Sequence, residues 1–335
     1  MNLTEENEGN EGGMRRLSSF PSLPSVKKEN FCAIGLDVGG TKIAAGLLLI
    51  GERRALARRT IPTQADRGGR AVLDDVIQLS HGLGAEAAAL GHPVEAIGVG
   101  VCELVDRQGN LASSNCIHWL DEPILEELSG IAPAVIEADV RAAALAEALL
   151  GAGQPFRCFL YVTVGTGISC CLMLDGSPHV GARGATGTMA SSSLSVPCER
   201  CGHISRRTLE DIASGPALVA RFNAAVGGAS SGQDVLDTAI KGDPSAEEIV
   251  HSAAEALGSQ VGLLVNVLDP EAVIVGGGLG LSDGPYWDHL LVSTRRHIWS
   301  RLHRDLPILR AATGVDAGWM GAAMSAHRQF NAKGT

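Results

Sequence analysis

Two stretches of this chain share one arrangement, in which a glycine-rich turn separates two apolar runs. Residues 37–42 (DVGGTK) lie between the runs 33–36 and 43–49, and residues 164–167 (VGTG) lie between two similar runs. Short apolar runs bounded by glycine are typical of strands, and segments with helical spacing follow them. These segments are residues 70–90, 141–150, 208–225, 246–268 and 319–329. Strands that alternate with helices predict an α/β fold, and the repetition predicts two related domains with a cleft between them.

The first turn has residues that suit a phosphate group. Adjacent glycines let backbone N–H groups approach an anion closely, and a carboxylate at a strand end, here Asp37, can hold Mg²⁺, usually through water. The spacing differs from the Walker A pattern, which needs four residues between its first glycine and the Gly-Lys pair. A hairpin with a Gly-Gly turn is the alternative, because apolar residues flank the turn on both sides. The turn by itself leaves both interpretations open.

Length and composition narrow the class of protein. A chain of 335 residues predicts about two domains, and a hydrophobic content of 45% is typical of a globular chain with a large core. The net charge of −10 argues against a nucleic-acid partner. No apolar stretch reaches the roughly 18 residues that span a bilayer, so a membrane partner is not expected either.

Residues 1–30 differ from the rest of the chain. They are rich in Asn, Glu, Gly and Ser and contain no apolar signal segment, which predicts a disordered tail. Without a secretory signal, the eight cysteines are expected to be thiols or metal ligands rather than disulfides. We therefore expect a cytoplasmic protein.

The glycine-rich turns at 37–42, 165–167 and 276–278, together with Asp139, resemble the ROK family of sugar kinases. The resemblance covers about residues 31–330 and implies the actin-like, hexokinase-like fold of two RNase-H-like α/β domains. It implies an N-terminal domain of residues 31–138 plus about 318–335, a C-terminal domain of residues 139–317, and a homodimer. It also implies transfer of a phosphoryl group from ATP, with Mg²⁺, to a sugar-like acceptor.

The resemblance assigns three segments to ATP. The first phosphate loop is Asp37, Gly39, Gly40, Thr41 and Lys42, the second is Thr163, Gly165, Thr166 and Gly167, and the adenosine segment is Gly276, Gly277, Gly278 and Leu279. Asp139 takes the place of the general base, which accepts the proton of the attacking hydroxyl. An N-cap is the alternative role for Asp139, because an alanine-rich helix begins just after it. Both roles can hold together.

The residues expected to bind the acceptor depart in part from the family pattern. Asn115 and Glu210 match sugar-binding positions, whereas Glu103 occupies a position that is usually Gly. Thr188 and Ser191 stand where family glucokinases carry a Glu and a His that contact the sugar near its anomeric end. A site built to hydrogen-bond a hydroxyl discriminates by about 10⁴-fold or more against an analogue that lacks it. Plain glucose is therefore not the favoured substrate.

The predicted acceptor is a CH₂OH group on a six-membered polyol ring. Divergent members of the family include kinases for C7-cyclitols such as 2-epi-5-epi-valiolone, in pseudo-aminosugar biosynthesis, and others that phosphorylate kanosamine at its 6-hydroxyl. A cyclitol has no anomeric centre, which suits the loss of the Glu and the His. A 6-kinase for glucose or kanosamine is the alternative. A ROK-type transcriptional regulator and a catalytically inactive sensor are less favoured, because no helix-turn-helix pattern precedes Phe31 and because Asp37 and Asp139 are intact.

A structural zinc ion is a further expectation from the resemblance. Within the loop 198–208, Cys198, Cys201 and His203 are three candidate ligands, and the Cys-x₂-Cys spacing suits zinc. A fourth ligand is not evident in the loop, so Cys116 or His179 would have to supply it from elsewhere in the chain. A reduced, metal-free loop is the alternative.

Overall fold

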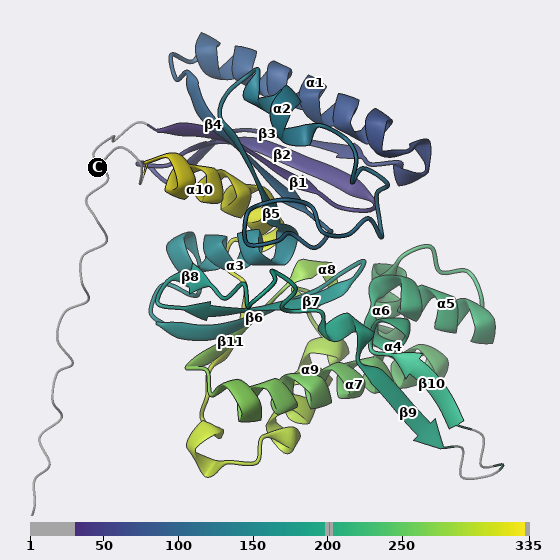
Figure 1. Ribbon diagram of the computed structural model, residues 1–335. Coiled ribbons are helices and arrows are strands. Elements are labelled where there is room, and N and C mark those ends of the chain that lie inside the picture. The colour runs from purple at the N-terminus through teal and green to yellow at the C-terminus, as the bar shows by residue number, and fades with distance from the viewer. Residues whose placement is uncertain (1–30, 198–200, 202–203, 332–335) are drawn as a thin grey trace, which may run out of the picture.

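The computed structural model describes residues 31–197, 201 and 204–331 (Figure 1). Its first half is built on a five-stranded sheet with the strand order β3-β2-β1-β4-β5. The strands are β1 (Cys32–Val38), β2 (Lys42–Leu49), β3 (Arg54–Pro62), β4 (Val94–Val101) and β5 (Ala134–Ala138). The first three form an antiparallel meander, and β4 and β5 then add in parallel to β1.

A second five-stranded sheet repeats this connectivity. Its strands are β6 (Cys158–Val164), β7 (Ile168–Leu174), β8 (Ser177–Pro178), β11 (Ala272–Gly276) and β12 (Ile308–Arg310). Their order is β12-β11-β6-β7-β8, again with an antiparallel meander of three strands and two parallel additions. The predicted α/β fold, with two related sheets, is confirmed.

Helices cover both faces of each sheet (Figure 1). The outer face of the first sheet packs on α1 (Gly69–Ala89) and α2 (Ile124–Ser129), and between the two sheets lie α3 (Asp139–Leu150) and α10 (Ala317–Asn331). The far face of the second sheet packs on a group of five helices. They are α4 (Glu210–Ala213), α5 (Gly215–Ala225), α6 (Gly232–Ile240), α7 (Pro244–Leu268) and α9 (Pro285–His297). A short helix, α8 (Gly277–Gly280), follows β11, and a separate ribbon is formed by β9 (Ser193–Pro197) and β10 (Ile204–Thr208).

The described residues form three apolar cores, which explain why the central strands are nearly continuous apolar runs in the sequence. In β6, Leu160 and Val162 face the core beneath the second sheet, whereas Phe159 and Tyr161 face the core between the sheets. Side chains alternate between the two faces of a strand, so a strand covered on both faces needs apolar residues at every position. None of the helices in the described ranges is long and apolar enough to cross a membrane.

Glycines allow α10 to lie directly on the first sheet. A Cβ atom at Gly35 in β1 would overlap the carbonyl oxygen of Trp319, and one at Gly98 in β4 would overlap that of Ala322. On another side of α10, a Cβ atom at Gly321 would overlap the backbone of α3. This close packing fixes the start of α3, and therefore Asp139, against the edge of the first sheet.

Several elements differ from the predicted helical segments. The segment 208–225 is divided into α4 and α5 at Ser214, whose Oγ accepts a hydrogen bond from the N–H of Ala217 (3.2 Å) and caps α5. Pro216 is the second residue of α5 and suits the first turn of a helix. The segment 141–150 extends back to Asp139. The strands β3 and β12 and the helix α9 did not stand out in the sequence pattern, and the division into two domains near residues 138 and 318 stays a prediction.

Candidate active site

Two aspartates meet at the carboxyl edge of the first sheet. In the parallel strands β1, β4 and β5, Asp37 pairs in register with Gly100, and Gly100 pairs with Glu137. Asp139 follows two residues later as the first residue of α3. A Cβ atom at Gly100 would lie 3.7 Å from the Cα of Asp139, so the end of β4 is in contact distance of this residue. The register of the three strands therefore brings together two carboxylates that are about 100 residues apart in the sequence.

Both carboxyl groups have raised pKa values. Burial raises the pKa of Asp139 to about 7, the charge of Asp37 adds to the rise, and a hydrogen bond from the Val140 N–H to Oδ1 (2.6 Å) opposes it. Burial raises the pKa of Asp37 to about 6, while the charge of Lys42 lowers it. A carboxylate with a pKa near the operating pH is well suited to accept a proton from an attacking group. Asp139 is the N1 residue of α3 rather than its N-cap, which is Ala138.

We expect the reaction to depend on pH through Asp139. Only the ionised carboxylate accepts a proton, so kcat/KM should fall as the pH is lowered through about 7 and should level off above it. The measurement is kcat/KM for the acceptor between about pH 5 and about pH 9 in a buffer of constant ionic strength. Thermal unfolding at each pH controls for loss of the fold. A profile that stays flat down to about pH 5 would contradict the role of Asp139.

The first glycine-rich turn joins β1 to β2 and is held by hydrogen bonds on both sides. The N–H of Gly39 donates to the carbonyl oxygen of Lys42 (3.0 Å). Thr63 donates from Oγ1 to the Gly39 oxygen (2.6 Å) and from N–H to the Thr41 oxygen (3.0 Å). The hairpin interpretation is thus confirmed by the β1–β2 pairing. The side chains of Thr41 and Lys42 remain exposed, so the turn is also free to meet a ligand.

The second glycine-rich turn faces the first. It joins β6 to β7 and is closed by a hydrogen bond from the N–H of Gly165 to the oxygen of Gly167 (2.9 Å). The hydroxyl of Thr166 lies 3.4 Å from that of Thr41, although the two residues are 125 positions apart. Below the turn, Oε2 of Glu210 accepts a hydrogen bond from the Ile168 N–H (2.9 Å). The glycine-rich turns of the two sheets therefore place one exposed hydroxyl group each at the same point of the molecule.

The third turn packs against the second. Thr163 of β6 pairs with Gly276 of β11, and the chain then turns at Gly277, whose φ is +80°. A Cβ atom at Gly277 would also overlap the backbone at the end of β6, so only glycine fits there. The N–H nitrogen of Gly278 lies 3.7 Å from the position that a Cβ atom at Gly165 would take. The three predicted ATP segments are thus neighbours in space.

Leu279 continues this surface towards α5 and α6. It is buried, and its methyl groups lie 3.9 Å and 3.3 Å from the positions of Cβ atoms at Gly215 and Gly232, the first residues of these helices. The N–H of Gly215 donates to the oxygen of Gly165 (2.8 Å). The assignment of Leu279 to the adenosine segment stays a prediction.

Glu103 holds the loop that carries Asn115. Its Oε2 accepts hydrogen bonds from the Ser113 hydroxyl (2.5 Å) and the Asn115 N–H (2.8 Å). Its Oε1 accepts from the N–H groups of Cys116 (2.6 Å) and Ile117 (3.1 Å). Burial raises the pKa of Glu103, but these hydrogen bonds outweigh burial and hold the pKa below its usual value. The substrate contact suggested by the sequence stays a prediction; in the structure both carboxylate oxygens bind residues of the loop 113–117, so we expect Glu103 to position this loop.

The other predicted acceptor residues lie on exposed segments. The side chain of Asn115 is exposed beside the first sheet. Thr188 and Ser191 are exposed on the turn that precedes β9, where Ser191 Oγ donates to the Thr188 oxygen (2.9 Å). The N–H of Cys170 in β7 anchors this turn through the Gly187 oxygen (3.1 Å). The hydrogen bonds among the described residues do not connect the turn to Asp139.

Comparison with known proteins places these features in a family. The family model described as "ROK family" matches residues 33–329. The chain belongs to the ROK family. The glucokinase of Streptomyces coelicolor is 30% identical over 311 residues, which cover 87% of this chain and 96% of the relative. This similarity to a glucokinase confirms the prediction that the chain is a phosphotransferase.

Two solved ROK structures are similar over nearly their whole length. The ROK hexokinase from Thermus thermophilus is 34% identical, with a TM-score of 0.72, and the match covers 91% of this chain and all of that one (100%). The ROK family glucokinase from Streptomyces griseus, in complex with glucose and AMPPNP, is 29% identical, with a TM-score of 0.76 and coverage of 89% and 99%. The predicted actin-like fold is confirmed by these similarities.

Arg141, which stands at a position that is usually Asn in the ROK pattern, has a structural role that the sequence did not reveal. Its guanidinium is buried, and Nε donates to Oε1 of Glu137 (2.6 Å). The two terminal nitrogens donate to the carbonyl oxygens of Gly184 (3.1 Å) and Val105 (2.8 Å). Arg141 thus joins the start of α3 to two loops near the predicted acceptor site. A buried polar residue with several long-range partners gives no local sequence signal.

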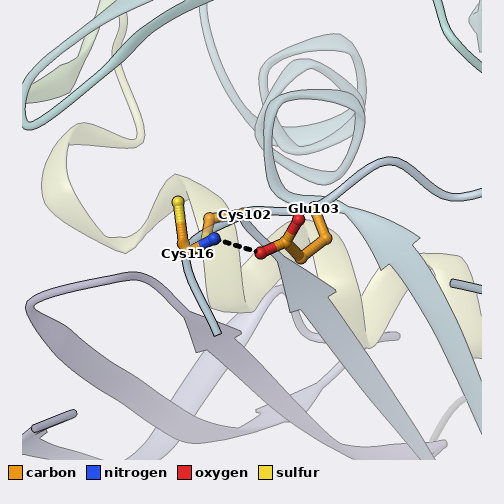
Figure 2. Close-up of side chains that lie close together, drawn as sticks. All are labelled: Cys102, Glu103 and Cys116. Atoms are coloured by element: carbon orange, nitrogen blue, oxygen red, sulfur yellow. Dashed lines mark hydrogen bonds between the residues drawn. The ribbon is translucent and has the colours of Figure 1, made fainter. Parts of the chain in front are cut away.

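A zinc ion in the loop 198–208 stays a prediction. Cys198 and His203 lie outside the described residues, and the described Cys201 is an exposed free cysteine. The structure reveals another cluster of metal-binding residue types, formed by Cys102, Glu103 and Cys116, with one ligand atom from each within 4.8 Å of the others (Figure 2). The sequence did not indicate this cluster, because its members come from the end of β4 and from a loop that returns to it.

Proposed function

We propose that this protein is an ATP- and Mg²⁺-dependent kinase that phosphorylates the primary hydroxyl of a six-membered polyol ring. The observation that carries the proposal is the position of Asp139. This carboxyl group lies at the edge of the first sheet with a pKa near 7, on the same edge as Asp37 and the first glycine-rich turn. The hydroxyl of Thr166, from the glycine-rich turn of the second sheet, lies beside that of Thr41, so both sheets contribute to this site.

The residues account for both halves of the reaction. The acceptor oxygen forms a bond to the γ-phosphorus, the bond from phosphorus to the ADP oxygen breaks, and the hydroxyl proton passes to the Asp139 carboxylate. Phosphoryl transfer depends mostly on in-line positioning and on neutralisation of the phosphate oxygens. The exposed hydroxyls of Thr41 and Thr166 and the ammonium group of Lys42 are suitable donors to those oxygens.

Asp37 is the residue that would hold Mg²⁺, through water, and the ion would neutralise charge on the phosphate oxygens. Its carboxylate lies against the first turn of α10, where a Cβ atom at Gly318 would overlap it. Partial positive charge at the start of a helix favours a carboxylate there. Carboxylate and water oxygens are the ligands that a hard divalent cation such as Mg²⁺ prefers.

For the acceptor, we propose a C7-cyclitol of the 2-epi-5-epi-valiolone type. Support comes from Thr188 and Ser191, whose neutral side chains replace the Glu and the His of family glucokinases on an exposed turn. A ring without an anomeric hydroxyl does not require those two partners. A hexose or an aminosugar such as kanosamine is the alternative acceptor, and a homodimer stays a prediction from the resemblance.

An assay of ADP release over a panel of acceptors tests this proposal. The panel contains 2-epi-5-epi-valiolone, other C7-cyclitols, kanosamine and glucose, and polyphosphate replaces ATP in a parallel series. We expect kcat/KM for the best cyclitol to exceed that for glucose by about tenfold or more, because one poorly matched polar group typically costs at least that factor.

A double variant provides the matched control for the panel. Thr188→Glu with Ser191→His restores the family side chains and should move the preference towards glucose. Phosphorylation of glucose by the unmodified protein at a rate equal to or above that of every cyclitol would contradict the proposed acceptor. Absence of ADP release with every acceptor, in a protein that binds ATP, would contradict the kinase assignment itself.

A further inference from the structure

Two cysteines lie side by side at the edge of the predicted acceptor site. Cys102 directly follows β4, and Cys116 belongs to the loop that Glu103 holds (Figure 2). Their sulfur atoms lie within 4.8 Å of each other, although the residues are 14 positions apart. Both are free thiols, and Cys116 is exposed while Cys102 is partly buried. An oxidant in solvent can therefore reach the pair.

The environment of this pair differs from that of the other strand cysteines. Cys32, Cys170 and Cys171 are buried, and burial raises the pKa of each thiol, which makes these groups unreactive. For Cys116, the hydrogen bond with the Cys102 thiol lowers the pKa to about 7, while burial and the charge of Glu103 oppose the change. The same hydrogen bond and burial raise the pKa of Cys102, so the pair loses its first proton from Cys116 more readily than an isolated cysteine does and holds the second proton on Cys102.

Glu103, the third member of the cluster, already accepts hydrogen bonds on both carboxylate oxygens, which argues against a metal site. Each carboxylate oxygen of Glu103 already accepts two hydrogen bonds from the loop 113–117. These four bonds use the acceptor capacity of the group. Coordination of a metal ion by Glu103 would release part of the loop. The two thiols are left as a reactive pair without a third ligand.

We propose that Cys102 and Cys116 are an oxidation site, at which a peroxide forms an intrachain disulfide that stops phosphorylation of the acceptor. One thiolate attacks hydrogen peroxide, so that its sulfur becomes a sulfenic acid and hydroxide leaves and takes a proton to form water. The Cys102 thiol then attacks the sulfenic sulfur, the S–S bond forms, and the hydroxyl group leaves with the thiol proton as water. Two thiols lose two electrons, and one peroxide is reduced to two molecules of water.

The position of Cys116 explains why the disulfide would act on the acceptor side. An S–S bond is about 2 Å long, so oxidation draws the sulfur atoms together and ties the loop of Cys116 covalently to the end of β4. Cys116 carries its neighbour Asn115 with it, and its Cβ lies 3.8 Å from the position of a Cβ atom at Gly40 in the first glycine-rich turn. The charge of Cys116 also contributes to the raised pKa of Asp139, which shows that the thiol is near the proposed base. The loss of activity rests on the proposed function, whereas formation of the disulfide does not.

The experiment treats the full chain with a small excess of hydrogen peroxide and maps its tryptic peptides without reduction. Arg107 separates the cysteines, so the disulfide would join peptide 71–107 to peptide 108–141. We expect this cross-linked pair in the oxidised protein and its disappearance after dithiothreitol. We also expect at least a tenfold loss of ADP release on oxidation, reversed by dithiothreitol. For each variant, the readout is the ratio of oxidised to reduced activity.

Cys102→Ser should abolish both the cross-link and the sensitivity to peroxide, whereas the control Cys158→Ser, on β6, should change neither. Absence of the 71–107/108–141 cross-link, including a result in which only sulfenic or sulfinic acid forms, would overturn the proposal. So would a cross-link that leaves ADP release unchanged in an active enzyme. If no acceptor is phosphorylated even by the reduced protein, the proposed function fails, while the cross-link still decides whether the oxidation site exists.

Discussion

Replacement of Asp139 by Asn should lower kcat by about 10²- to 10⁴-fold while acceptor binding stays within about threefold. The amide has nearly the same shape as the carboxylate and can still accept the Val140 N–H hydrogen bond, but it cannot take the proton of the attacking hydroxyl. Steady-state ADP release gives kcat, and calorimetric titration with acceptor gives the dissociation constant. The separation of turnover from binding is the signature of a general base.

Stability provides an internal check on this variant. Because the folded state raises the pKa of Asp139 to about 7, ionisation of this group costs the folded state stability as the pH rises above the ordinary pKa of a carboxyl group. The Asp139→Asn substitution removes that cost, so the melting temperature near pH 7 should stay the same or rise. Asp288→Asn, on the exposed surface of α9, is the matched control and should keep full turnover. Turnover of Asp139→Asn within about threefold of the unmodified protein would refute the assigned role.

Replacement of Glu103 by Gln should lower kcat/KM for the acceptor by about 10²-fold and leave KM for ATP within about threefold. The carboxylate accepts four hydrogen bonds from the loop 113–117, and an amide offers only one oxygen to them. Its NH₂ group would instead face backbone N–H donors. A hydrogen bond to a charged group contributes about 1.5–3 kcal/mol, so the loss of two should also lower the free energy of unfolding by several kcal/mol.

Measurement of KM for ATP and for the acceptor, with each substrate varied in turn, distinguishes an effect on the acceptor loop from an effect on the whole fold. Because hydrogen bonds hold the pKa of Glu103 below its usual value, its ionised form stabilises the folded state, and this stability is lost as the pH falls through the lowered pKa. Near neutral pH, the stability difference between the two proteins should therefore be complete. Glu126→Gln, on the exposed face of α2, makes the same change of charge and should alter neither constant. Equal increases of KM for ATP and acceptor would show that Glu103 supports the whole fold rather than the acceptor loop.

Local patterns in the sequence were sufficient for the α/β fold and the glycine-rich turns. The runs on both sides of residues 37–42 and 164–167 pair as β1–β2 and β6–β7, because strand pairing across a short turn depends on neighbouring residues. The two sheets have the same connectivity, as the repeated arrangement of run, glycine-rich turn and run in the sequence predicted. Helix ends were less accurate, since the division between α4 and α5 depends on a single cap at Ser214.

Contacts between distant residues could not be predicted in the same way. The sequence marked Glu103 as unusual, but only the returning loop 113–117 shows what its carboxylate does. Likewise, Cys102 and Cys116 had no common sequence signal, and their proximity exists only because this loop packs against the end of β4. A buried carboxylate takes the partners that the fold supplies, and its role follows from those partners.

The sequence alone therefore determined the family resemblance, the two related sheets and the two aspartates, because each rests on short motifs that can be recognised one at a time. The tertiary structure decided which of these segments meet. It placed Thr41 opposite Thr166 and set Asp139 in a buried position beside Asp37, where burial first and the charge of Asp37 second raise the pKa of Asp139 towards neutrality. The physical reason is that burial and charge interactions depend on distance in space, and residues more than 100 positions apart come close only when the two sheets and the helices between them have packed.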